Sequence, residues 1–229
     1  AVHYPGDAHI TPQVFMHQML HHLKQEGVVF LPGKEITGIH DHGHTGAEVS
    51  TADGDILRAR HIVVAAGSWS GKLLKKRGYR LPMQDGKGYS MTLERPSLKP
   101  SIPSILHEAR VAITPMGDDL RISGTLEISG MDDQINPHKV NSILKAVPEY
   151  YPGIKIKDAG PVWFGYRPCT PDGMPYIGPL QSGSAVIMAT GHAMMGLSLA
   201  PVTGRIVKDM LAGISSGHAL NKTEPSRFR

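Results

Sequence analysis

Cysteine and long apolar runs are what this sequence most conspicuously lacks. The one cysteine, Cys169, excludes an intramolecular disulfide and fits a reducing compartment. The longest apolar stretches, such as residues 62–66 and 185–189, are far too short to cross a bilayer as a helix. Residues 1–7 lack the charged and apolar regions of a signal peptide, and no initiator methionine precedes them. The start therefore reads like the middle of a longer protein.

Charge of one sign is also scarce. The formal net charge is only +4, with 24 basic and 20 acidic residues. The one dense basic cluster comprises Lys72, Lys75, Lys76, Arg77 and Arg80. Such a cluster is typical of a solvated helix end, and contact with an acidic lipid or protein surface is the weaker interpretation. No RNA-binding signature or helix-turn-helix pattern is present, so we expect no nucleic-acid partner.

What the 229 residues do contain is enough apolar material for one large domain or two small ones, with 40% hydrophobic and 19% charged residues. Helical spacing predicts helices at 12–25, 68–77, from Pro137 onward and at 197–211. Strand patterns occur at 28–31, 36–40, 47–51, 56–59, 61–66, 88–94, 110–114, 120–127, 159–166 and 185–189.

The order of these elements predicts the fold class α/β plus α+β. Residues 1–78 and 184–214 form a discontinuous α/β lobe, because buried strands alternate there with helices. Residues 79–183 form an inserted antiparallel-sheet lobe, and residues 215–229 form a polar, loose C-terminal tail.

A rigid loop that carries one arginine is the first candidate site. Arg167 stands at the end of a predicted strand, before a loop to Gly178 that contains Pro168, Pro171 and Pro175. A guanidinium held on a rigid edge suits bidentate binding of a carboxylate. A structural arginine in a surface loop is the competing interpretation.

Two strand-to-helix turns are the other candidate sites. The run 189–201 joins a buried strand to a helix through Gly191 and Gly196, where a ligand can approach the backbone and the helix N-terminus. The run 62–70 leads a buried strand into Ala65, Ala66 and Gly67, and nucleotide cofactors lie beside such small residues in α/β sheets. Either turn alone is also compatible with an ordinary βα connection.

Together, these three segments resemble the DAO-type FAD-dependent oxidoreductases, and most closely the bacterial D-amino-acid dehydrogenases. The resemblance extends from about residue 7 to residue 211. It implies that the α/β lobe is an incomplete FAD-binding lobe of the GR2-type Rossmann-like class, and that the inserted lobe binds the substrate.

The resemblance also implies residue roles. Arg167 would bind the substrate carboxylate, and Gly196 would bring a helix start to the flavin. Tyr89, Tyr166 and His192 would line the substrate pocket. The positions implied to border FAD are Val28, Val29, Ala65, Ala66, Gly67, Trp69, Gly191, His192, Met194, Met195, Gly196 and Leu197.

One departure from that family is large. The family begins with a strand, G-x-G-x-x-G and a helix, which bind the FAD pyrophosphate. The nearest string here, residues 86–91, lacks the third glycine and is not expected to open a helix. We therefore expect this chain alone to be an inactive fragment whose sheet has an open edge, available for pairing with the missing segment or with another copy.

Other candidate residues are weaker. His40, His42 and His44 alternate and could share a face as zinc or nickel ligands, but no fourth ligand is in view, so no metal is expected. His17 and His21 lie one helical turn apart without the Glu that zincins need. Cys169 has no identifiable base nearby in sequence and is interpreted as structural.

The resemblance implies oxidation of a D-amino acid at its Cα–N bond to an imino acid, then to a 2-oxo acid and ammonia. Glycine, sarcosine or D-hydroxyproline specificity is an alternative, and so is a non-catalytic amino-acid-binding subunit. Relatives of this kind often pass electrons to a membrane quinone, which implies a location that is either cytoplasmic or peripheral on the inner membrane face.

Overall fold

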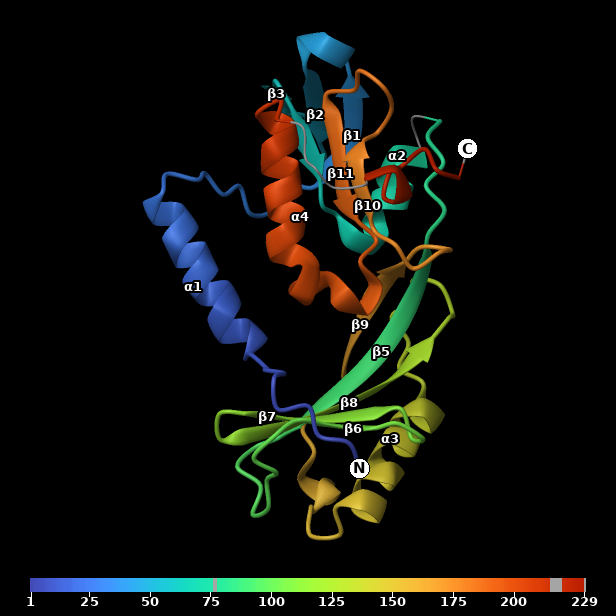
Figure 1. The fold of residues 1–229 in the computed structure, drawn as a ribbon. Coiled ribbons are helices and arrows are strands. Elements are labelled where there is room, and N and C mark those ends of the chain that lie inside the picture. Colours follow the sequence, from blue (N-terminus) through green and yellow to red (C-terminus); the bar gives the residue numbers. More distant parts are fainter. Residues whose placement is uncertain (76–77, 215–219, 229) are drawn as a thin grey trace. The chain divides into compact units, whose positions relative to one another are not determined.

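The computed structural model describes residues 1–75, 78–214 and 220–228 (Figure 1). The chain divides into two compact units. The first comprises residues 1–32, 88–127 and 132–165, and the second comprises residues 33–87, 128–131 and 166–229. No helix among the described residues is both long and apolar enough to cross a membrane.

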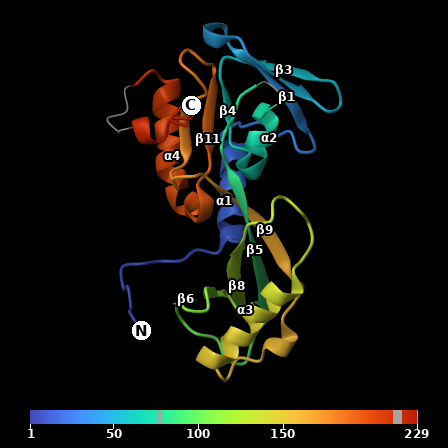
Figure 2. The ribbon, with the colours of Figure 1, turned by 90° about the vertical axis from the view of Figure 1, so that its right-hand side faces the viewer.

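An antiparallel sheet with one helix against it organises the first unit (Figure 2). The strand order is β6-β7-β8-β5-β9. The strands are β5 (Gln84–Leu93), β6 (Ser104–Leu106), β7 (Val111–Met116), β8 (Asp119–Glu127) and β9 (Trp163–Cys169). The helix α3 (Pro137–Tyr150) begins at Asn136, whose side chain accepts hydrogen bonds from the backbone N–H groups of His138 and Lys139. This cap satisfies donors that the first helical turn leaves unpaired.

The core of this unit lies between α3 and the sheet. The predicted apolar face of α3 is confirmed at Val140, Ile143 and Val147, which are buried, while Leu144 packs at the edge of the core. Alternate residues of β7 and β8, including Ile113 and Ile122, are fully buried beneath it. Period-two alternation in the strands and helical spacing in α3 thus meet in one cluster.

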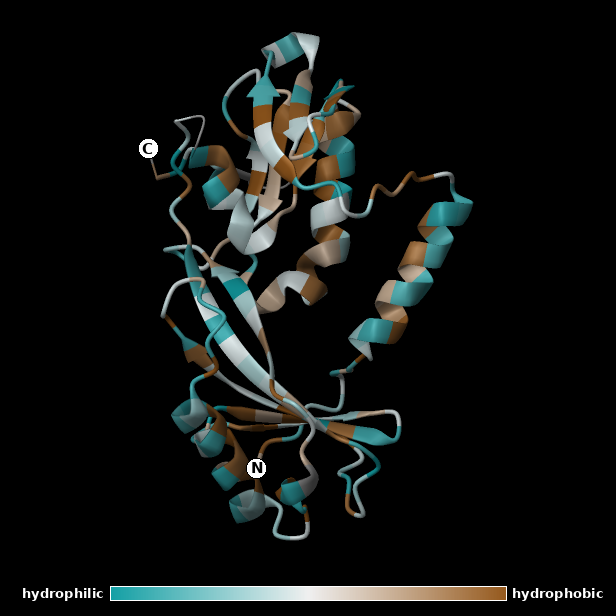
Figure 3. Cartoon of the chain, turned by 180° about the vertical axis from the view of Figure 1, so that it is seen from behind, coloured by the Kyte–Doolittle hydropathy of each residue, from teal (hydrophilic) through white to brown (hydrophobic). Residues whose placement is uncertain are grey.

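The helix α1 (Pro12–Gln25) has the predicted bounds but buries none of its side chains. Hydrophilic and hydrophobic residues alternate along it in Figure 3. Thr11 precedes it without making a side-chain cap. The short strand predicted at 28–31 is wrong, since these residues pair with no strand. A strand exists only where a neighbour accepts and donates its backbone hydrogen bonds.

The second unit contains two small sheets. The meander β1 (Ile36–Asp41), β2 (Ala47–Thr51) and β3 (Ile56–Ala59) is antiparallel, as predicted. The other sheet has the order β10-β11-β4, from β10 (Tyr176–Pro179), β11 (Val186–Thr190) and β4 (Ile62–Val64). Strand β11 pairs with β4 in parallel, so segments far apart in sequence lie side by side.

Two helices complete the second unit. The helix α4 (Gly196–Leu211) packs on β10 and β11, and the short α2 (Ser70–Lys75) packs on β1. Residues Lys76 and Arg77 of the basic cluster lie outside the described residues. The carboxylate of Asp41 accepts hydrogen bonds from the Ser184 hydroxyl (2.5 Å) and from the backbone N–H of Ala185 (3.0 Å). This contact ties the end of β1 to the start of β11.

The compact units divide the chain differently from the lobes expected from the sequence. Residues 1–32 group with the antiparallel sheet, and residues 166–183 group with the parallel strands. The second difference follows from β10, a strand within the stretch expected to be loop, because β10 pairs with β11. The C-terminal segment 220–228 is not loose, since the backbone N–H of Ile177 donates to the carbonyl of Thr223 (2.9 Å).

Candidate functional site

The carboxyl ends of β4 and β11 form the centre of the candidate site. Because these strands are parallel neighbours, the turns after Val64 and Thr190 emerge at the same edge of the sheet. The Thr190 hydroxyl donates to the backbone carbonyl of Gly67 (3.2 Å) and accepts from the Ser70 hydroxyl (3.2 Å). Sequence reasoning missed this link, although a threonine that ends a buried strand before a glycine was a visible signal.

Two glycines at this edge have positive φ for different reasons. Gly67 has a φ of +52°, and a Cβ added there would meet nothing within 4 Å, so its surroundings are open. Gly191 has a φ of +81°, and its added Cβ would lie 2.7 Å from Cγ2 of Thr170. Gly67 therefore leaves room for a ligand, whereas Gly191 allows the rigid loop after β9 to pack against the turn.

The start of α4 lies at the same edge, and no side chain caps it. A short 3-10 turn, Ala193–Met195, leads directly into Gly196, and no side chain caps the helix. Uncapped N–H groups and the helix dipole favour negative charge at this position. Ala193 has a φ of +47°, a strained value for a residue with a Cβ.

Exposed apolar side chains surround this helix start. Met194, Met195 and Leu197 are 72%, 53% and 41% exposed, and Trp69, on the turn after β4, is 55% exposed. Trp69 makes an edge-on contact with the ring of Tyr166, with centroids 6.3 Å apart. A flat apolar ring system bound here would cover these side chains. Their exposure to water is unfavourable compared with such burial.

Strand β9 brings Arg167 toward this region. Two residues farther along the same strand, Cys169 bridges to His192 in the turn after β11. Burial lowers the pKa of the Arg167 guanidinium, which nevertheless stays charged as arginine does in proteins. A partly desolvated guanidinium attracts a carboxylate more strongly than one in bulk water does.

His192 and Cys169 are held in polar contacts of their own. The His192 Nε2 lies 2.9 Å from the Thr203 hydroxyl of α4, and burial lowers the pKa of the imidazole, which favours its neutral form. Burial raises the pKa of the Cys169 thiol, whose sulfur donates to the carbonyl of Arg167 (3.4 Å). A protonated thiol is a poor nucleophile, in keeping with a structural role.

Three predicted site residues belong to the first unit. Tyr89 is 1% exposed in the core beneath α3, and its hydroxyl donates to Glu127 (2.7 Å) and accepts from the backbone of Asn136 (3.2 Å). It therefore packs inside the first unit and does not line an open pocket there. Val28 and Val29 are 45% and 79% exposed in the first unit, away from any strand. Their contact with a cofactor stays a prediction.

Tyr166 and Arg167 are adjacent on β9, so strand alternation directs their side chains to opposite faces. The Tyr166 ring meets Trp69, and Arg167 shares its face with Cys169. For the histidine candidates, the described part of the chain gathers no three His, Cys, Asp or Glu side chains that could hold a metal ion.

The comparison with known families decides the affiliation of the chain. The profile of the family described as FAD dependent oxidoreductase, DAO, matches residues 1–210. The chain belongs to this family. The match extends well beyond the glycine-bearing turns, and it includes both compact units.

Individual relatives agree. The chain is 33% identical over 211 residues to a D-amino acid dehydrogenase of Methylobacterium radiotolerans, with 91% of this chain and 50% of that protein covered. It is 36% identical over 194 residues to a D-amino acid dehydrogenase of Rhizorhabdus wittichii, covering 83% and 46%. The crystal structure of a glycine oxidase from Bacillus cereus matches 95% of this chain and 60% of its own, with 27% identity and a TM-score of 0.78. The chain thus spans about half the length of the curated relatives it matches.

The residues at this edge fit part of an FAD. Gly67 offers open space, the uncapped start of α4 offers N–H donors, and the exposed Met194 and Met195 offer an apolar surface. These features suit the flavin ring and its ribityl chain, which carry no phosphate charge. The string 86–91 lies within strand β5 and opens no helix, so it does not offer the glycine turn that binds a pyrophosphate.

Proposed function

We propose that this chain forms the amino-acid and flavin side of an FAD-dependent dehydrogenase that oxidises a D-amino acid at its Cα–N bond. The α-hydrogen leaves as a hydride and the amine loses a proton. Water then hydrolyses the imino acid to a 2-oxo acid and ammonia. FAD, when bound, supplies the acceptor for the hydride. The parallel-strand unit would serve the cofactor, and the antiparallel sheet would serve the substrate.

The observation that carries this proposal is the bridge between Cys169 and His192, which ties the strand of Arg167 to the glycine edge. Arg167 would hold the substrate carboxylate by two parallel N–H donors, which orients the Cα–H bond. The start of α4 at Gly196, which no side chain caps, would stabilise the negative charge that the cofactor gains when it accepts the hydride.

Neutral His192 would position the turn and would not act as an acid. Its Nε2 is engaged with Thr203, and burial disfavours its charged form. A mechanism in which the α-hydrogen leaves as a hydride needs no side chain to remove it as a proton. The electron acceptor in this proposal is a membrane quinone, reached from the cytoplasmic face.

Oxidation of glycine is the second candidate, because the glycine oxidase of Bacillus cereus matches nearly the whole chain. The two candidates differ in the space required at Cα, since glycine has no side chain there. Steady-state rates with glycine, sarcosine and a series of D-amino acids, using oxygen and a soluble quinone as alternative acceptors, separate them.

The test of the proposed carboxylate site is Arg167→Met in the flavin-loaded protein that contains this chain. We expect kcat/KM for D-amino acids to fall. The fall should correspond to a loss of transition-state stabilisation of about 3–5 kcal/mol, because a bidentate charge-assisted contact is lost. Arg80→Met is the matched control, since Arg80 is exposed and its replacement by Met removes the same charge. Near-normal kcat/KM accompanied by loss of flavin would assign Arg167 to the cofactor and contradict the proposal.

A further inference from the structure

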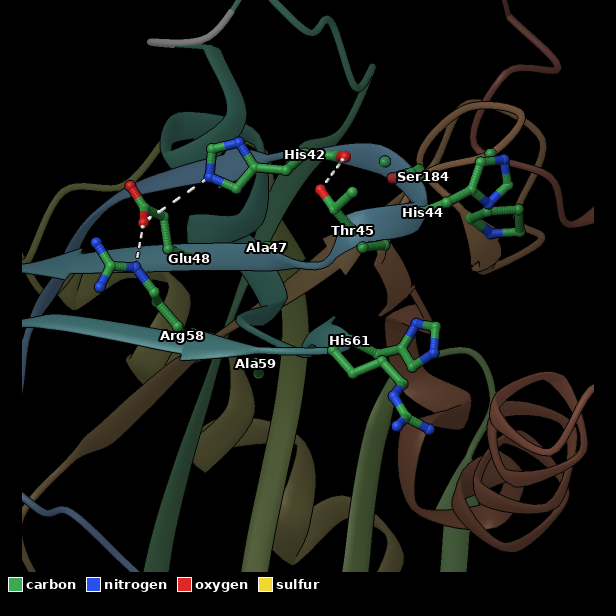
Figure 4. A pocket seen from close by; sticks show the side chains of 14 residues that line it. His42, His44, Thr45, Ala47, Glu48, Arg58, Ala59, His61 and Ser184 are labelled. Carbon is green, nitrogen blue, oxygen red and sulfur yellow. Dashed lines mark hydrogen bonds and ion pairs between the residues drawn. The ribbon is translucent and has the colours of Figure 1, made fainter.

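A hollow lies at the amino ends of the parallel strands β4 and β11. His61 directly precedes β4, and Ser184 and Ala185 directly precede β11, so the hollow is at the amino ends of these strands. The glycine edge described above is at their carboxyl ends. The hollow has a volume of about 770 Å³ and lies wholly within the second unit (Figure 4). It is separate from the proposed flavin edge.

Basic side chains dominate the lining of this hollow. They come from the β1–β2 turn, from the end of β3 and from the residue before β4, and they are His42, His44, Arg58, Arg60 and His61. Glu48 is the one carboxylate among the lining residues. The remaining lining is small or aliphatic, with no Phe, Tyr or Trp side chain on which a nucleobase could stack.

One side of the hollow is already balanced in charge. Glu48 Oε2 lies 3.0 Å from Arg58 Nε and 3.8 Å from His42 Nε2. The hydrogen bond from Arg58 lowers the pKa of the Glu48 carboxyl. Figure 4 shows this group together, with His44, His61 and Ser184 lying apart from it. A further anion gains little from Arg58 while Glu48 is bound to it.

The other side, formed by His44, Arg60 and His61, has no such balance. None of these three side chains forms an ion pair within the described residues. The nearby Asp41 keeps its negative charge, but its two oxygens accept from Ser184 and from the backbone N–H groups of Gly43 and Ala185, and they form no ion pair with these three side chains among the described residues. Arg60 adds a guanidinium donor to this side, and each imidazole can add an N–H donor.

The backbone helps to position this side. Gly183 has a φ of +74°, and a Cβ added there would lie 3.2 Å from Nε2 of His44. The imidazole thus rests close to the turn between β10 and β11, and its ring would have to shift if Gly183 had a Cβ. The Asp41 contacts hold the same turn from the other strand. A fixed imidazole loses less side-chain entropy on binding than a free surface histidine does.

We propose that this hollow binds a phosphate-bearing anion through His44, Arg60 and His61. The planar guanidinium of Arg60 can donate two parallel N–H bonds to phosphate oxygens, and the imidazoles can add single N–H donors. The volume accommodates more than one anionic group, and the lining offers no stacking surface for a nucleoside. The ligand chemistry is therefore that of pyrophosphate or of a phosphorylated headgroup.

The test is calorimetric titration of the full 229-residue chain with pyrophosphate, at an ionic strength of about 0.15 M so that diffuse charge is screened. The test variant is Arg60→Gln combined with His61→Gln, and we expect its affinity to be at least about tenfold weaker, because the charged donor and one neutral donor are lost. Arg205→Gln is the control, since Arg205 lies on α4 outside the hollow. This substitution removes the same fixed charge as Arg60→Gln does. We expect that control to bind as the parent does.

Thermal unfolding followed by circular dichroism verifies that both variants fold, which their surface positions lead us to expect. A second arm measures co-sedimentation with vesicles of phosphatidylcholine alone and with added phosphatidylinositol phosphate. Binding to the phosphorylated vesicles that depends on Arg60 and His61 supports a lipid headgroup, and binding to free pyrophosphate alone supports a soluble ligand. Absence of both, or equal binding by the double variant, overturns the proposal.

Discussion

Gly191 shows how packing restricts a single residue at the candidate site. Its φ of +81° disfavours any residue with a Cβ, and an added Cβ would also approach Tyr176 Cδ2 to 3.3 Å in addition to Thr170. The sequence suggested that this glycine admits a ligand. The structure indicates instead that it admits the loop after β9, so its replacement acts on the site through the fold.

We predict that Gly191→Ala lowers the free energy of unfolding by about 2–4 kcal/mol, because backbone strain and overpacking add. The matched control is Gly54→Ala, where φ is +93° but nothing lies within 4 Å of the added Cβ. It should cost only the strain, about 1–2 kcal/mol. Urea unfolding of the two variants gives the comparison, and equal losses would show that the Thr170 contact relaxes freely.

The C-terminal segment is an element that the sequence did not reveal. Arg227, whose side chain is 9% exposed, binds both carboxylate oxygens of Asp172 at 2.9 and 3.0 Å. Its guanidinium lies 4.2 Å from the centroid of the Tyr176 ring. The segment thereby fastens the loop that follows Arg167 to strand β10, and it should limit the motion of that loop.

This contact predicts a pH dependence of stability. Hydrogen bonding from Arg227 lowers the pKa of Asp172 to about 2, below its ordinary value of about 3.9. The stabilisation is therefore complete above about pH 5 and is lost as the pH falls through about 2. Because the Asp172 side chain is 36% exposed, solvent screening should limit it to about 1 kcal/mol.

The variant Arg227→Met isolates this contribution. At about pH 6 its free energy of unfolding should be lower than that of the parent by about 1–2 kcal/mol, with the lost cation–π contact included. At about pH 2 the difference should shrink toward the part that does not depend on the Asp172 charge, since about half of the Asp172 carboxyl groups are then protonated even in the folded state. That remaining part comes from the cation–π contact and from the hydrogen bonds of Arg227 to the carbonyls of Glu224 and Met174. Arg80→Met serves as control. A difference that stays constant with pH would contradict the assigned pairing.

At the scale of the whole molecule, the glycine edge at the carboxyl ends of β4 and β11 offers, among the described residues, no binding element for the pyrophosphate of FAD. Gly67 and the start of α4 suit the flavin and its ribityl chain, but a pyrophosphate needs a glycine turn that opens a helix. The sequence contains no G-x-G-x-x-G string, and β4 is an edge strand of its sheet among the described residues. An edge strand of this kind invites pairing with another chain segment.

We predict that residues 1–229, expressed alone, retain no FAD through gel filtration and show no turnover. Absorbance between roughly 350 and 500 nm reports the flavin. Mass spectrometry of the same sample establishes that no second polypeptide is present. Stoichiometric flavin in a chain so verified would mean that the glycine edge alone binds the cofactor, and the prediction would be wrong.

Local patterns alone were sufficient for several of the regular elements. The bounds of α1, β2 and β3 match the predicted ranges, because helical spacing, a proline at the first helical position and period-two alternation act over a few neighbouring residues. The family affiliation was also accessible, since the turns at 65–70 and 191–197 and the loop after Arg167 are continuous in sequence.

Only the tertiary structure decided how those pieces are used. Tyr89, which the resemblance places in a substrate pocket, is buried under α3. Residues 28–31 are rich in β-branched and apolar residues but find no strand to pair with. Strand β10, the Thr190–Gly67 link and the contact of Arg227 with Asp172 join residues distant along the chain. Local sequence sets the propensity and the hydrophobic pattern of each segment. Burial and strand pairing depend instead on which distant segments pack against it, and only the folded chain determines those contacts.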